Sequence, residues 1–84
     1  MIILVATRNG FDELKSVIET GNFPVWVGQC VLSEKEIDML RENDIDLTDF
    51  NYSIDPKNKE DIKCALQTIS EHHPGERVWL ECQP

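Results

Sequence analysis

The sequence is poor in positive charge. Lys and Arg together number 8, against 16 Asp and Glu, so the formal net charge is −8 at pH 7. Such a chain is repelled by a phosphate backbone and by an anionic membrane surface, because long-range charge governs the approach of these partners. We therefore expect neither nucleic-acid binding nor membrane binding.

Long apolar runs and glycine-rich loops are also missing. The apolar run from Ile2 to Ala6 is far too short to cross a bilayer, and no basic segment or small-residue cleavage site marks it as a signal peptide. The chain contains no GxGxxG and no GK[ST] motif, the loops with which many proteins hold phosphate groups. We expect no cofactor.

Cysteine and histidine are scarce and do not form a recognised pattern. The odd number and wide spacing of Cys30, Cys64 and Cys82 argue against a disulfide framework, so we expect reduced thiols and a cytoplasmic location. Cys82, near Arg8, and Cys30 are the candidates for a reactive thiol, but no histidine is expected near Cys82 to activate it, so we assign no catalytic cysteine. His72 and His73 are adjacent and point in different directions from a helix, so we expect no metal site.

What the sequence does contain is an alternation of strand and helix patterns within one domain, residues 1–84. We expect strands at Ile2 to Ala6, Phe23 to Val27, Ile45 to Phe50 and Arg77 to Cys82, and helices from Gly10 to Thr20, from Glu34 to about Asn43 and from Pro56 to His73.

Capping residues fix where these helices begin and end. Asn9 is the expected N-cap of the first helix, and Asp55, followed by a proline, that of the third. Before the second helix, Ser33 and Glu36 have the spacing of a capping box. Asn43 is expected to end that helix in the left-handed conformation.

This βαβαβαβ order indicates an α/β fold with a mostly parallel four-stranded sheet and helices on both faces. The first strand is the most apolar and should be central, whereas the third is the most polar and should lie at an edge. Strand order 3-2-1-4 satisfies both conditions. Order 2-1-3-4 and an antiparallel last strand are the alternatives.

In an open parallel sheet, ligands bind beyond the carboxyl ends of the strands, where the strand order reverses. For order 3-2-1-4 this point lies between the first and last strands. A cation and a glycine near a helix N-terminus there suit an anion such as phosphate. The alternative is a surface turn with a solvated arginine. The candidate ligand-binding residues are Thr7, Arg8, Asn9, Gly10 and Cys82.

Acidic residues are concentrated in and after the second helix. Seven lie between positions 34 and 49, opposed by only two basic residues. Glu34, Asp38 and Glu42 follow one another at i, i+4 and i+8, on a line turned away from the apolar side of the helix. This line is either a solvated face or a docking surface for a basic protein partner.

The two tryptophans lie in the middle of expected strands. We expect Trp26 and Trp79 to pack in the core against helices. If the last strand is an edge, Trp79 or the strand backbone could instead pair with another chain and give a homodimer.

Together these features predict a small acidic cytoplasmic protein that acts as a non-enzymatic protein-interaction or regulatory module. The alternative is an anion-binding or phosphate-binding domain at the ends of the first and last strands. Neither alternative assigns a catalytic residue.

Overall fold

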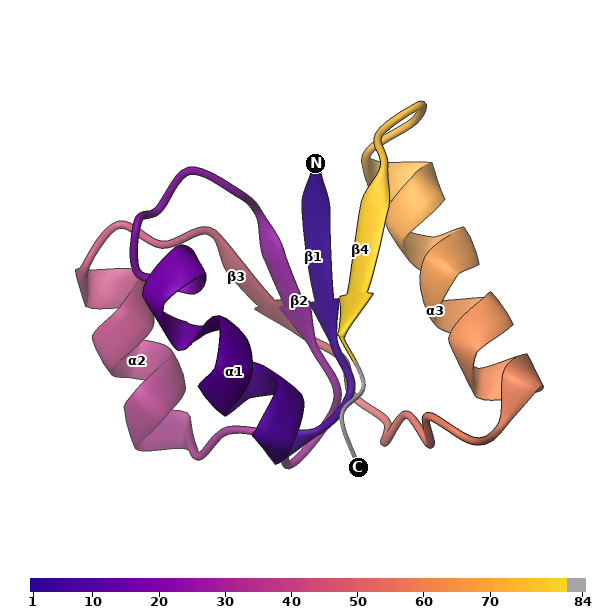
Figure 1. The fold of residues 1–84 in the computed structure, drawn as a ribbon, viewed down its shortest axis with the longest axis horizontal. Coiled ribbons are helices and arrows are strands. Elements are labelled where there is room, and N and C mark those ends of the chain that lie inside the picture. Colours follow the sequence, from indigo (N-terminus) through magenta and orange to yellow (C-terminus); the bar gives the residue numbers. More distant parts are fainter. Residues whose placement is uncertain (82–84) are drawn as a thin grey trace.

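A computed structural model describes residues 1–81 and contains four strands alternating with three helices (Figure 1). In chain order these elements are β1 (Ile2–Val5), α1 (Arg8–Ile18), β2 (Val25–Val27), α2 (Glu34–Glu42), β3 (Leu47–Asp49), α3 (Lys59–His72) and β4 (Val78–Glu81).

The four strands form one parallel sheet in the order β3-β2-β1-β4, which confirms the predicted fold and strand order. All four residues of β1 are buried, as a central strand with layers on both faces requires. β3 has one buried, one half-buried and one exposed residue, and it lies at an edge. The apolar β1 is therefore central and the more polar β3 lies at an edge, as their residues predict.

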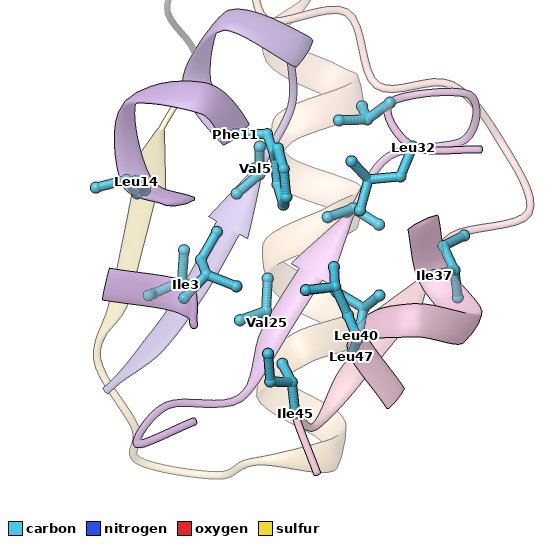
Figure 2. Close-up of a cluster of buried hydrophobic side chains, with 13 residues drawn as sticks. Ile3, Val5, Phe11, Leu14, Val25, Leu32, Ile37, Leu40, Ile45 and Leu47 are labelled. Atoms are coloured by element: carbon cyan, nitrogen blue, oxygen red, sulfur yellow. The ribbon is translucent and has the colours of Figure 1, made fainter. Parts of the chain in front are cut away.

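Successive residues of β1 face opposite sides of the sheet and so belong to two separate cores. Ile3 and Val5 pack with the apolar sides of α1 and α2, in the cluster drawn in Figure 2. Ile2 and Leu4 pack in a second cluster that includes residues of α3. α1 and α2 thus share one face of the sheet, and α3 covers the other (Figure 1).

The second cluster contains most of the aromatic contacts. Trp26 of β2 is 6% exposed, and its ring centroid lies 5.2 Å from that of Phe50. The rings of His72 and His73, at the end of α3, lie 5.5 and 6.2 Å from Trp26. The prediction of core packing is therefore confirmed for Trp26, whereas Trp79 of β4 is 43% exposed and the same prediction is wrong there.

The first helix begins two residues before its predicted start. Thr7, and not Asn9, is the N-cap: its backbone is extended, and its Oγ1 accepts a hydrogen bond from the Gly10 backbone N–H at 3.0 Å. The Thr7 carbonyl accepts the first helical hydrogen bond, from the N–H of Phe11. The helix ends at Ile18, and Gly21 after it has a positive φ of 72°.

The second helix ends in a Schellman motif whose left-handed residue is Asp44 (φ 63°), and not Asn43 as predicted (φ −90°). The Asp44 N–H donates to the Arg41 carbonyl, and the Ile45 N–H donates to the Leu40 carbonyl. Leu40 and Ile45 also share the first core cluster, which is the apolar contact typical of this motif.

The third helix begins later than its predicted cap at Asp55. Asn58 is the N-cap, and its Oδ1 accepts from the N–H groups of Glu60 and Asp61. Asp55 instead forms its own turn, in which its Oδ1 accepts from the Lys57 N–H at 2.9 Å. β2 and β3 are also shorter than predicted, because only Val25–Val27 and Leu47–Asp49 pair in the sheet. β4 begins one residue later than predicted, and its predicted end at Cys82 lies outside the described residues.

Candidate functional site

The predicted partner-binding residues lie on α2, whose start is fixed by the predicted capping box. Ser33 Oγ accepts from the Glu36 N–H at 3.2 Å, and Glu36 Oε1 accepts from the Ser33 N–H at 3.1 Å. Ile37 and Leu40 are buried against the sheet. With that side fixed on the core, the helix turns its acidic line outward.

Glu34, Asp38 and Glu42 are all exposed, and we call these three residues the acidic row. Within residues 1–81, no cation lies within 4 Å of their carboxylates. The carboxylates that do form ion pairs belong to Asp12, Glu19, Glu36, Asp49 and Glu76. The acidic row therefore remains uncompensated although several neighbouring acids are paired.

Arg41, the basic residue in the last turn of α2, is directed toward β3. Its Nη2 lies 3.2 Å from Asp49 Oδ1, and its Nε and Nη2 both donate to the Leu47 carbonyl, at 3.2 and 3.1 Å. These contacts fasten α2 to the edge strand. They also pair the positive charge of Arg41 with Asp49, which is not part of the acidic row.

A groove of about 440 Å3 lies between α1 and α2, and none of the three residues of the acidic row lines it. Met39, which is 56% exposed, lines it together with the buried side chains of Phe11, Leu40 and Ile45. Met39 follows Asp38 directly, and successive helix residues point in different directions, so the groove and the acidic row lie on different sides of α2. Sequence reasoning did not identify this groove; its one signal was a methionine on the polar side of the helix.

The predicted ligand-binding residues Thr7 to Gly10 form the N-cap and the first turn of α1. Thr7 caps the helix, and Gly10 is buried within it. The Arg8 guanidinium lies at 2.8 Å from both carboxylate oxygens of Glu36, through Nη1, and its Nε lies 3.3 Å from Asp12. The arginine thus joins α1 to the start of α2.

This ion pair shifts the pKa of both side chains. The hydrogen bond from Arg8, followed by that from the Ser33 backbone, lowers the pKa of Glu36 to about 2. The same hydrogen bond raises the pKa of Arg8. An anion bound here would compete with Glu36 and Asp12 for Arg8. The anion-binding alternative stays a prediction, and Cys82 lies outside the described residues.

The other candidate groups are dispersed. Cys30 and Cys64 are both exposed free thiols, on the loop after β2 and on α3. Over the described part of the chain, no three His, Cys, Asp or Glu side chains are grouped so that they could hold a metal ion.

None of the helices described is both long enough and apolar enough to span a membrane. Comparison of the chain with protein-family models, with curated proteins and with solved structures gives no match.

Proposed function

We propose that this protein is a non-enzymatic interaction module that binds a basic protein partner through the exposed surface of α2. The observation that carries the proposal is the acidic row, three exposed carboxylates at i, i+4 and i+8 with no cation of residues 1–81 beside them. Basic side chains of a partner would supply the missing charge and speed association by electrostatic attraction.

The acidic row is unfavourable for the isolated helix. Like charges four residues apart cost about 0.2–0.5 kcal/mol per pair, and the row contains two such pairs, Glu34 with Asp38 and Asp38 with Glu42. Glu34 gains something from its place in the first turn, where the helix dipole favours an acid. A cationic partner relieves the repulsion and so gains affinity from it.

The groove between α1 and α2 adds an apolar contact on another side of the same helix. Interfaces draw most of their affinity from a few well-packed apolar or aromatic side chains, while charged residues at the rim set orientation and rate. Met39 is unbranched and adaptable, which suits the edge of such a contact. The partner that fits is therefore one that contacts two sides of α2, with an apolar side chain for the groove and Lys or Arg for the acidic row.

We place this interaction in the cytoplasm. Cys30 and Cys64 are free thiols on the surface, and exposed thiols of this kind persist in reducing compartments. The odd cysteine count of the whole chain agrees with the same assignment.

Charge reversal on α2, set against a matched reversal elsewhere, tests the proposal. The test variant carries Glu34→Lys, Asp38→Lys and Glu42→Lys. The control variant carries Glu13→Lys, Glu60→Lys and Glu71→Lys, all at exposed positions outside α2. Each triple variant changes the formal net charge from −8 to −2, since every substitution adds two charges.

Each variant is immobilised and used to capture proteins from a cell lysate, and bound proteins are identified by mass spectrometry. We expect the test variant to lose a basic partner that the wild type and the control variant retain. Circular dichroism checks that all three fold. Equal capture by the two triple variants would contradict the proposal, because only total charge would then matter.

A further inference from the structure

The edge of the sheet farthest from the acidic row is formed by β4. In strand order β3-β2-β1-β4 it pairs with β1 on one side and with no strand of residues 1–81 on the other. The Ile2 N–H donates to the Arg77 carbonyl at 2.7 Å, so Arg77 and, by the alternation of a parallel ladder, Trp79 bond toward β1. The backbone groups of Val78 and Leu80 are consequently directed outward.

The side chains of this strand divide between the two faces of the sheet. Val78 and Leu80 pack against the cluster under α3. Trp79 pairs in register with Ile3, whose side chain belongs to the opposite cluster, and it is 43% exposed. An exposed tryptophan beside an open strand edge is a surface that edge pairing would cover.

Residues 78–80 read Val-Trp-Leu, so the order of aliphatic, aromatic and aliphatic side chains is the same in either direction. An antiparallel pairing of two copies centred on Trp79 sets Trp79 opposite Trp79, and Val78 opposite Leu80. Cross-strand aromatic and apolar pairs are among those that stabilise a sheet.

This register also satisfies the backbone geometry. Val78 and Leu80, which face outward, form the hydrogen-bonded pairs and provide about four backbone hydrogen bonds between the copies. Trp79 then occupies a non-hydrogen-bonded position on the two-fold axis, where opposing side chains are closest. A shift of one residue would place each outward-directed residue opposite one that bonds toward β1 and lose these bonds.

A groove of about 410 Å3 continues the same edge in the helix layer. Ile62 and Leu66 of α3 line it with Leu80 of β4, and all three are only half-buried within the described chain. Two-fold pairing of β4 brings the two α3 layers together on one face of the joined sheet. The grooves then meet across the axis, and their apolar side chains are covered.

We propose that two copies of this chain form a symmetric dimer by antiparallel pairing of β4, with Trp79 against Trp79. The dimer joins two four-stranded sheets into one continuous sheet. Its acidic rows remain at the outer ends of the joined sheet, because α2 packs near the edge formed by β3 and the copies meet at the edge formed by β4 (Figure 1). The proposal is independent of the partner-binding function, since it uses the other edge.

Sedimentation velocity over a range of protein concentrations measures the association. We expect a monomer–dimer equilibrium whose dissociation constant rises at least about tenfold in Trp79→Arg, because like charges then face each other and the aromatic pair is lost. Met39→Arg is the matched control: it introduces the same arginine at another exposed apolar residue and should leave the monomer–dimer equilibrium unchanged. A wild type that stays monomeric, or a dimer lost only in Met39→Arg, overturns the proposal.

Disulfide trapping tests the register. In a background with Cys30, Cys64 and Cys82 replaced by serine, Trp79→Cys should cross-link two copies on mild oxidation, because two residues on the axis lie within disulfide reach. Val78→Cys is the control, since position 78 faces position 80 and not itself. Cross-linking through position 78 with none through 79 overturns the proposed pairing.

Discussion

Among the helices of residues 1–81, α3 is the one that packs on the face of the sheet with Ile2 and Leu4, so removing a buried side chain from it should be costly. Ile69 is 0% exposed and packs in the cluster with Ile2 and Leu4. Ile69→Ala removes three buried carbons, worth about 2.4 kcal/mol at about 0.8 kcal/mol each. The residual cavity raises this to about 3–4 kcal/mol, and the better helix propensity of alanine returns a few tenths.

Urea unfolding followed by circular dichroism, at one protein concentration, measures the effect. With a slope of about 1 kcal/mol per M for a chain of this size, a net loss of about 3 kcal/mol lowers the midpoint by about 3 M. Ser70→Ala, at the adjacent exposed position, is the control and should change stability by no more than about 0.5 kcal/mol. If Ile69→Ala is as mild as this control, α3 does not pack on the sheet as described.

Four further substitutions test the helix ends and the Arg8–Glu36 pair. Asp44→Gly should raise the free energy of unfolding by up to about 1 kcal/mol, because glycine adopts positive φ without strain. Asn43→Gly should lower the free energy of unfolding by about 0.5–1 kcal/mol, because Asn43 has negative φ. A higher melting temperature for Asn43→Gly than for Asp44→Gly would place the left-handed residue at Asn43. Asn58→Ala should lower stability by about 1 kcal/mol through loss of the α3 cap, and an unchanged urea midpoint would refute that assignment. The pKa of Glu36 is lowered to about 2 from an ordinary 4.5, so its contribution to stability is present above about pH 4.5 and is lost as the pH falls toward 2. The stability difference between wild type and Arg8→Met should therefore shrink over that range, and a difference independent of pH would count against the ion pair.

The arrangement of the strands was predictable because it follows from hydrophobicity alone. β1 is apolar at every position and can only be stable with a layer on each face, whereas the polar β3 tolerates an edge. Right-handed crossovers then determine that α1 and α2 share one face and that α3 crosses to the other. Little besides the alternation of polar and apolar residues is needed for this result.

The helix ends were harder to predict because the chain offers several capping residues close together. Thr7 and Asn9 can each cap a helix, and the choice depends on where β1 leaves the sheet. Asp55 and Asn58 compete in the same way. Asp55 is drawn into a separate turn, and its N–H donates to the Asp61 carboxylate at 3.1 Å. Such contacts arise only after the chain has folded.

Part of the candidate site could be predicted from the sequence and part could not. Exposure of the acidic row follows from helical periodicity, since Ile37 and Leu40 fix which side of α2 is buried. The pairing of Arg8 with Glu36 joins residues 28 positions apart, and the groove at Met39 requires two helices to pack. No local pattern in the sequence indicates either feature.

The most direct test of the proposed function is to map where a basic segment contacts the protein. An arginine- and lysine-rich peptide with one central leucine is titrated into 15N-labelled protein, and backbone amide shifts are followed by NMR. We expect the largest shifts at Glu34 to Glu42 and around the groove at Met39, and their loss in the variant with the acidic row reversed. Shifts spread evenly over the acidic residues of α1, α2 and α3 would contradict the account, because they would indicate general charge attraction without a site.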